Sequence, residues 1–449
     1  MSITTHSETP HAAMAYGRGV KLFFTTAIIV LITESIGNFT IPITASTKIV
    51  LFPLLWALML AATLGVVSKR VPPSIAISRD VQDLAAAVLQ PAMLIFIAKL
   101  ALLVGGNLPK IISSGWGLVF QEFGHFFGTM MIGLPIALML GIKREAVGAT
   151  FSVGREPSLA IIGERFGMNS PEGHGALAEY LTGTVFGAIF IALLASVLTS
   201  TGIFNPLALA MGAGVGSGTM MTAAAGAIAA QQTPEVAKHV AAFAAASNLI
   251  TTTIGTYFTL FISLPFTLWA YKTLEPVLGR MSKRSPASTG VAVESAAHES
   301  HKPLSFGAHV FIWVFVALVA LIGNWVNFKQ PPDLATLAGA GIMAGVVFIG
   351  YLLYRVTFRK LPALIWVTVI GMAASYPTFP FAAEIAVLTG KINFMAITTP
   401  ILAIAGLSIA KDIPAFRRLG WRIVVVSFAA SAGSFIGAAV IAQFFMHAI

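Results

Sequence analysis

Long runs of apolar residues alternate with short polar connections along most of the chain. Several of these runs reach the ~20 residues that an α-helix needs to cross ~30 Å of hydrocarbon. The pattern predicts an all-α integral membrane protein with about eleven transmembrane helices. These helices are expected near residues 22–43, 50–67, 84–104, 116–141, 175–200, 240–271, 306–326, 334–354, 362–383, 393–410 and 421–446.

Two further apolar stretches, 146–163 and 205–229, contain glycine and proline, and the first also contains Arg155 and Glu156. Non-helical backbone at membrane depth is tolerated only where it is buried in protein or lines a water-filled cavity. We therefore expect both stretches to be re-entrant or broken helices rather than plain spans.

Composition agrees with membrane embedding. Of the 449 residues, 57% are hydrophobic and only 10% are charged, which excludes the polar exterior of a soluble protein. The absence of cysteine excludes disulfides, thiolate metal sites and haem attachment, and we expect no cofactor. The first 20 residues are polar and lack a small-residue cleavage site, so no removed signal peptide is expected.

The net charge of +10 indicates topology rather than nucleic-acid binding. If both interrupted stretches return to the side from which they start, 20 of the 27 lysines and arginines fall on the cytoplasmic side, as the positive-inside rule requires. Two of the others, Lys99 and Arg155, lie at membrane depth. The remaining five fall outside: Lys48, Lys110, Lys238, Lys329 and Lys391.

The polar stretch 279–304 is rich in serine, alanine and glycine, which is typical of a flexible linker. It divides the chain into two membrane-embedded halves. The expected organisation is a cytoplasmic tail (1–21), N-terminal membrane helices that are partly scaffold (22–141), a candidate transport region (142–271), a cytoplasmic linker (272–304) and C-terminal membrane helices (305–449).

An internal similarity relates residues 90–120 to residues 399–425. The matching positions are Pro91 with Pro400, Pro109 with Pro414, and Gly115-Trp116 with Gly420-Trp421. The topology gives the two copies opposite orientations, which predicts an inverted repeat of the kind found in many secondary transporters. A weaker similarity, between Ile36–Phe39 and Ile322–Trp325, has the same orientation in both copies.

The first interrupted stretch contains Gly154-Arg155-Glu156-Pro157-Ser158. A helix that starts at Pro157 would offer free N–H groups and a positive dipole end, and Arg155 would add a fork of donors. Such a break could hold a carboxylate, sulfonate or phosphate. The candidate substrate-binding residues here are Ser152, Gly154, Arg155, Pro157 and Ser158, with Glu156 as a candidate for the coupling ion or proton. In the alternative interpretation, Arg155 and Glu156 neutralise each other or lie in a cytoplasmic loop.

The second interrupted stretch has glycine at positions 212, 214, 216 and 218. Glycine costs ~1 kcal/mol relative to alanine inside a helix, so this density predicts an unwound segment whose backbone faces a ligand. The candidate substrate-binding residues are Gly214, Gly216, Ser217, Gly218 and Thr219. Close helix packing through small residues is the alternative.

Other polar residues within apolar runs are weaker candidates. Asn248 is added to the substrate-binding set, and Glu179 and Thr252 to the coupling set. Gln121, Glu122 and His125 have helical spacing and could carry protons, or could lie at a half-exposed end of a span. No Ser-His-Asp arrangement can be argued and H-E-x-x-H is absent, so we do not expect an enzyme.

The two interrupted glycine-rich segments, the repeat and the linker together resemble the cation:proton antiporter/anion transporter superfamily. The organisation is similar to that of the 2-hydroxycarboxylate and glutamate:sodium symporters. The strings GREPS (154–158) and GVGSG (214–218) resemble those of a functionally unassigned family of bacterial inner-membrane proteins. The GGxG strings of the symporters do not occur at the two segments, so their substrates cannot be transferred. The resemblance implies an elevator mechanism in which residues 146–271 move against a dimeric scaffold.

The expected function is secondary active transport of a small organic anion, by symport with Na⁺ or H⁺, in a bacterial inner membrane. The expected partners are the anionic substrate, the coupling ion, membrane lipids and a second copy of the chain, with no metal and no nucleic acid. A channel or holin-like export protein is an alternative. A cation:proton antiporter is another, although Arg155 could neutralise its candidate carboxylate, Glu156.

Overall fold

The computed structural model describes residues 10–42, 48–113, 116–153, 155–167, 170–253, 255–279, 304–357, 363–409, 411 and 420–447. Within these residues, seven helices are long and apolar enough to cross a membrane. They are α1 (Pro10–Ile36), α3 (Arg79–Ser113), α4 (Gly117–Met139), α7 (Pro171–Thr182) continued through the π-helical η2 (Gly183–Gly187) into α8 (Ala188–Thr201), α14 (Phe306–Phe328), α15 (Leu334–Val356) and α20 (Trp421–His447). The protein is therefore a multi-pass membrane protein.

The other described helices are shorter or interrupted. They are α2 (Pro53–Val66), η1 (Val67–Arg70), α5 (Glu145–Thr150), α6 (Arg155–Phe166), α9 (Pro206–Ala213), α10 (Gly218–Ala229), α11 (Pro234–Thr253), α12 (Gly255–Phe258), η3 (Thr259–Ser263), α13 (Leu264–Leu278), α16 (Ala363–Ser375), α17 (Ala382–Gly390) and α18 (Phe394–Ile409). The 14 residues of α2 extend only about 21 Å, which covers part of the predicted span 50–67. The number of eleven spans stays a prediction.

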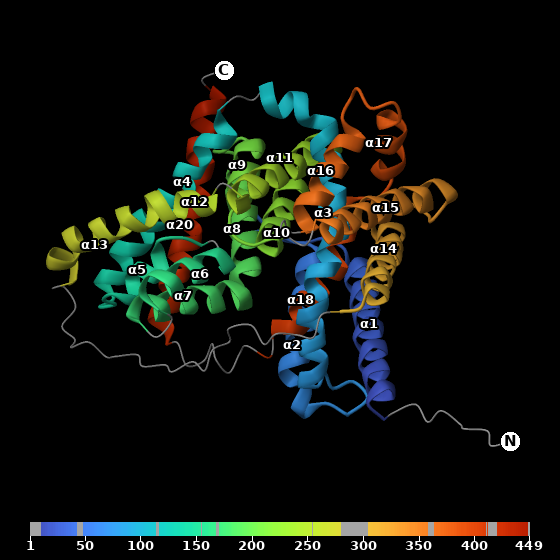
Figure 1. The fold of residues 1–449 in the computed structure, drawn as a ribbon, viewed down its shortest axis with the longest axis horizontal. Coiled ribbons are helices and arrows are strands. Elements are labelled where there is room, and N and C mark those ends of the chain that lie inside the picture. The colour runs from blue at the N-terminus through green and yellow to red at the C-terminus, as the bar shows by residue number, and fades with distance from the viewer. Residues whose placement is uncertain are drawn as a thin grey trace.

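Figure 1 shows α4–α7, α13 and α20 on one side of the molecule, with α1 and α14–α17 on the other. Helices α8–α11 lie between these two groups. One short element departs from the predicted all-helical pattern: β1 (Phe39–Pro42) and β2 (Lys48–Leu51) pair antiparallel after α1. Both strands are rich in β-branched residues, which favour extended backbone.

Helices α4 and α20 cross with their backbones in contact. Gly124 and Gly128 of α4 face Gly437 and Gly433 of α20, and a Cβ atom on any of the four would overlap a carbonyl oxygen of the other helix. Small residues four positions apart allow this approach. Because Gly124 meets Gly437 while Gly128 meets Gly433, the two helices run antiparallel. Helix α4 follows Gly115-Trp116 and α20 follows Gly420-Trp421, so the helices that come after the two similar segments pack antiparallel.

Helices α1 and α14, which carry the weaker similarity, run parallel. The Phe23 ring lies 4.6 Å from that of Phe315, while further along both helices the Asn327 side-chain amide donates to the Glu34 carboxylate at 2.8 Å. Both contacts therefore follow the same direction along the two helices. This arrangement agrees with the shared orientation predicted from the charges.

Helices α17 and α18 form a third interrupted segment, with a bend of 60° between them. Asn324 of α14 holds the break, since its amide donates to the Lys391 carbonyl at 3.0 Å and its side-chain oxygen accepts from the Asn393 N–H at 2.9 Å. Lys99, predicted to lie at membrane depth, is 3% exposed and donates to the Thr389 carbonyl at 2.5 Å. Its ammonium group therefore lies at the C-terminal end of α17, where a helix dipole favours a cation.

The start of α15 is fixed to the same break. Asp333 caps α15 by accepting from the Thr336 N–H at 2.7 Å, and the Lys391 ammonium lies 3.0 Å from its other oxygen. The hydrogen bonds from Thr336, followed by that from Lys391, hold the pKa of Asp333 below its ordinary value. The carboxylate therefore stays charged, and its cap and ion pair connect the start of α15 with the α17–α18 break.

Candidate functional site

The first interrupted segment is two short helices separated by a break. Helix α5 ends at Thr150, and α6 begins at Arg155, two residues before the predicted start at Pro157. Proline fits there because the first-turn N–H groups of a helix have no partner within it. The Ser263 hydroxyl of η3 donates to the Phe151 carbonyl inside the break. The predicted interruption is therefore present, and a neighbouring helix holds its backbone.

The second segment is also broken, although its unwound part is shorter than the glycine spacing suggests. Helix α9 includes Gly212 and α10 begins at Gly218, so the break covers 214–217. Gly216 has φ of +79°, which favours glycine, and the Ser217 hydroxyl caps α10 by accepting from the Met220 N–H at 3.2 Å. The packing alternative holds for Gly212, where a Cβ would lie 2.7 Å from the Phe435 carbonyl oxygen.

Helix α11 holds the second break through two consecutive side chains. The Ser247 hydroxyl donates to the Met211 carbonyl at 2.7 Å, and the Asn248 amide donates to the Gly214 carbonyl at 2.8 Å. A Cβ atom on Gly214 would overlap Ser247. These contacts place Asn248, a predicted binding residue, directly at the break.

The two breaks meet in the interior of the protein. Val153 of the first break and Val215 of the second form one buried cluster with Ala430 and Ala438 of α20. Helices α6 and α10 begin at this crossing, while α5 and α9 end there. Helix N-termini attract anions and helix C-termini attract cations. The crossing therefore brings together helix ends that suit both kinds of ion.

The predicted residues of the first segment lie at this crossing to different extents. Ser152 is buried inside the break and has a polar partner. Ser158, one turn into α6, is 4% exposed, and its hydroxyl has no hydrogen-bond partner among the described residues. Gly154 and the side chains of Arg155, Glu156 and Pro157 lie outside what the structure describes.

Of the other predicted residues, Thr219 and Glu179 lie at or near the breaks, whereas Thr252 does not. Thr219 lies at the second break, where its hydroxyl is 2.8 Å from that of Ser217. Glu179 is buried in α7, which packs against α5 and α20, and it has a polar partner. Thr252 is exposed and donates to the Asn248 carbonyl of its own helix at 2.8 Å. The structure therefore does not bring the Thr252 side chain to the crossing.

Two buried ionisable residues of α4, Glu122 and His125, lie beside the crossing. Gln121, Glu122 and His125 of α4 are at most 1% exposed, so the interpretation as a half-exposed span end is wrong. One Glu122 oxygen accepts from the Gln121 amide at 2.6 Å and from the Thr251 hydroxyl. The other Glu122 oxygen and the Nε2 atom of His125 have no partner among the described residues.

Two helices connect this pair with the crossing. Nδ1 of His125 bonds to the Ser434 hydroxyl, and Ser434 lies midway along α20 between Ala430 and Ala438, which pack against both breaks. On α11, Thr251 follows Asn248 by three residues, so the same helix face bonds to Glu122 and to the second break. The helical spacing of Gln121, Glu122 and His125 made them candidates for carrying protons, but neither Ser434 nor Thr251 could be linked to them from sequence.

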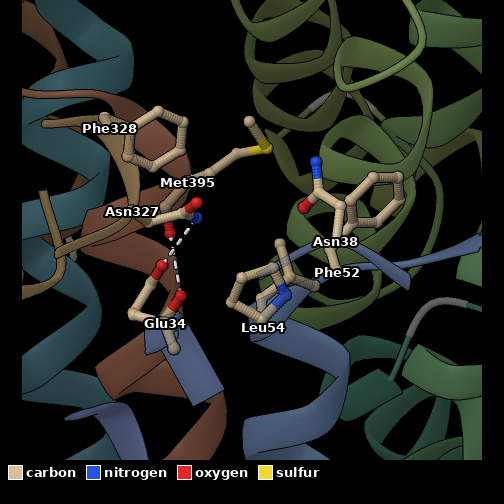
Figure 2. Close-up of a pocket in the computed structure, with 9 residues that line it drawn as sticks. Glu34, Asn38, Phe52, Leu54, Asn327, Phe328 and Met395 are labelled. Atoms are coloured by element: carbon tan, nitrogen blue, oxygen red, sulfur yellow. Dashed lines mark hydrogen bonds between the residues drawn. The ribbon is translucent and has the colours of Figure 1, made fainter. Parts of the chain in front are cut away.

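A second polar cluster, around the buried Glu34, lies far from the crossing along the chain. Figure 2 shows Glu34 and Asn327 facing a recess, with Asn38 across from them. The recess has a cavity volume of about 10 Å³ and is lined by Glu34, Asn38, Phe52, Pro53, Leu54, Asn327, Phe328, Met395 and Thr399. This volume is below the ~300 Å³ at which pockets for organic ligands begin. The recess therefore suits an ion or a water molecule better than an organic substrate.

The sequence was compared with known families, proteins and structures. No curated protein and no solved structure matches the chain. The resemblance to the antiporter/anion transporter superfamily therefore stays a prediction. One family model matches residues 31–273, which is more than half of the chain and includes both breaks, α4 and α11. The chain belongs to the family described as "Protein of unknown function (DUF3100)".

Proposed function

We propose that the protein is a secondary active transporter of a small, carboxylate-like organic anion, coupled to Na⁺ or H⁺. It works in a bacterial inner membrane by an elevator-type mechanism, with a second copy of the chain completing the scaffold. The proposal depends above all on one observation: two helix breaks, distant in sequence, pack against each other on one stripe of α20. Interrupted helices that meet in the interior are the usual way in which secondary transporters build a substrate site.

The anion would bind at the N-terminal ends of α6 and α10. Both helices have 12 residues, and both begin at the crossing. The unpartnered Ser158 hydroxyl lies one turn inside α6 and is available to donate. Arg155, the first residue of α6, supplies the charge that a carboxylate requires. The moving unit would include α4 and α20, because α20 packs against both breaks and its backbone contacts that of α4 at four glycines.

The transport reaction can be tested without knowledge of the coupling ion. Purified protein in liposomes loaded with an unlabelled carboxylate should take up the same labelled compound by exchange. Candidate carboxylates, sulfonates and amino acids can first be screened by thermal shift, since a ligand stabilises the folded state by mass action. Flux that follows the solute gradient, with no exchange and no response to a Na⁺ or H⁺ gradient, would indicate a channel and contradict the proposal.

Asn248→Ala should slow exchange while the protein still folds. The substitution removes the amide that holds the Gly214 carbonyl, and a buried polar group left without its partner costs about 1–3 kcal/mol. The matched control is Asn107→Ala, because among the described residues the Asn107 amide donates only to a carbonyl of its own helix, that of Leu103 at 2.8 Å. Exchange at the normal rate in Asn248→Ala would show that this bond does not position the break for transport.

The sequence assigned ion coupling to Glu156, Glu179 and Thr252, and the buried pair adds Glu122 as a proton carrier. Glu122 and His125 are the only ionisable residues of α4, and α9 has none. The ionisable groups of α20 are at its two ends, Arg422 and His447, and those of α11 lie in its first two turns. A buried carboxylate that faces no described cation binds a proton readily.

Glu122→Gln should abolish accumulation driven by a pH gradient but leave carboxylate exchange intact. Glutamine can still accept from Thr251, yet it cannot bind or release a proton. Both reactions can be measured in the same liposomes, with Glu235→Gln, an exposed change on α11, as the control. Accumulation that survives in Glu122→Gln would remove Glu122 from the coupling mechanism.

A cation:proton antiporter is the second candidate function, because the buried Glu122 could carry protons without any organic anion. An antiporter would move protons across the membrane in response to Na⁺ or K⁺ with no organic anion present. Proton release from liposomes on addition of each cation alone therefore distinguishes this function from anion transport.

A further inference from the structure

The Glu34 carboxylate lies inside the protein without an opposite charge. Glu34 is 2% exposed. Its Oε2 atom accepts from the Asn327 amide at 2.8 Å, and the Thr399 hydroxyl also faces the carboxylate. The other oxygen, Oε1, has no partner among the described residues. A carboxylate in this position is unfavourable unless a proton or a cation accompanies it.

Among the described residues, no side chain on the four helices that line the recess, α1, α2, α14 and α18, supplies that positive charge. Helices α2 and α18 contain no ionisable residue. The only one on α14 is His309, near its start, and the next ones along α1 are Lys21 and Arg18, more than three turns away. Lys329 follows α14 directly, and its ammonium group donates to the Val326 carbonyl of that helix at 2.7 Å.

Helix ends strengthen the preference for a cation. Helices α1 and α14 run parallel, and both end beside the recess, at Ile36 and Phe328. Their C-terminal carbonyls therefore add two partial negative charges to that of Glu34. The N-terminus of α2, at Pro53, contributes one opposing partial positive charge. The balance of carboxylate and helix ends is negative.

The size and the polar atoms of the recess indicate which cation fits. The space accommodates about one particle of the size of a water molecule. Glu34, Asn38, Asn327 and Thr399 provide carboxylate, amide and hydroxyl oxygens, which are ligands for hard cations. Ca²⁺ normally requires 6–8 oxygens with several carboxylates, whereas only one carboxylate lines this recess.

We infer that the Glu34 recess is a binding site for a monovalent cation, with Na⁺ as the ion of matching size. The site is separate from the crossing of the two breaks and does not depend on the protein being a transporter. Bound Na⁺ would neutralise Glu34 and join the ends of α1 and α14 to α18, which contributes Met395 and Thr399.

Thermal unfolding of the purified protein tests the site directly. At constant ionic strength, with choline replaced by Na⁺, the midpoint of the wild-type protein should rise with each tenfold increase in concentration above the dissociation constant. K⁺ should produce a weaker response at equal concentration. Glu34→Gln should abolish the response to Na⁺. In Asn38→Ala, the Na⁺ concentration needed for the same rise in midpoint should be at least tenfold higher. Glu384→Gln, an exposed carboxylate on α17, should leave the response unchanged.

Three results would overturn the assignment. The first is a wild-type midpoint that does not respond to Na⁺. The second is a response to Na⁺ that persists in Glu34→Gln. If that variant does not fold, the corresponding result is a response that is the same in Asn38→Ala as in the wild type. The third is stabilisation by acidification alone, which would mean that Glu34 carries a proton. Because the measurement is of binding, a failure of the transport assays would leave its outcome unaffected.

Discussion

Arg155→Ala is expected to abolish uptake and exchange of the carboxylate substrate while the protein remains folded. Arg155 is the first residue of α6, at the crossing where the proposed anion binds. A carboxylate bound by Arg155 would lose its charged partner, and loss of one partner of a charge pair in a binding site costs about 2–5 kcal/mol, a loss of affinity of about thirtyfold or more. The measurement is the concentration dependence of labelled exchange in liposomes, together with the thermal midpoint of the same preparation.

Two further variants make this result specific. Arg155→Lys keeps the charge but loses the two-pronged geometry of the guanidinium, so it should retain part of the activity. Arg165→Ala removes an exposed arginine from the last turn of the same helix and should behave like the wild type. Normal exchange in Arg155→Ala would refute the placement of the anion at the start of α6.

Gly148→Ala is expected to produce the largest loss of stability. Gly148 of α5 lies against α7, and a Cβ atom there would overlap the Glu172 carbonyl oxygen and lie 2.8 Å from the Ala176 nitrogen. Overpacking of this kind costs about 1–3 kcal/mol and sometimes more, which exceeds the gain of about 1 kcal/mol from replacing glycine in a helix. The change should also displace the first break, because α5 ends at Thr150.

The matched control is Gly117→Ala at the start of α4. Gly117 is also buried, but its nearest neighbour, the Cβ atom of Phe445, would lie at an ordinary contact distance of 3.6 Å. Thermal unfolding of both variants should show a lowered midpoint for Gly148→Ala alone. Equal midpoints would mean that α5 and α7 can separate slightly without loss of stability.

The sequence predicted the features that depend on neighbouring residues. Apolar runs predicted most of the long helices, and glycine and proline predicted the interruptions at 146–163 and 205–229, because both signals act within a few residues. The start of α6 was placed two residues too late, since a proline in the first turn does not fix which residue comes first. Gly212 belongs to α9, because its missing side chain admits α20.

The sequence could not show which residues distant along the chain are in contact inside the protein. His125 bonds to Ser434, 309 residues away, and Glu34 bonds to Asn327, 293 residues away. Each of these residues was visible as a polar position in an apolar run, but its partner follows from the packing of helices from both halves of the chain. The braced α17–α18 break was missed for the same reason, because Asn324 and Lys99 that hold it come from α14 and α3.

The glycine crossing of α4 and α20 also determines when the site can form during synthesis. Helix α4 leaves the ribosome early, whereas Ser434 follows His125 by 309 residues. At about 5–20 residues per second, α4 waits roughly 15–60 s for its partner. During that interval the backbone at Gly124 and Gly128, together with His125, has no α20 to cover it. The contact between α4 and α20 is therefore completed only when the last helix has been inserted, and a chain truncated before residue 421 would lack the helix against which both breaks pack.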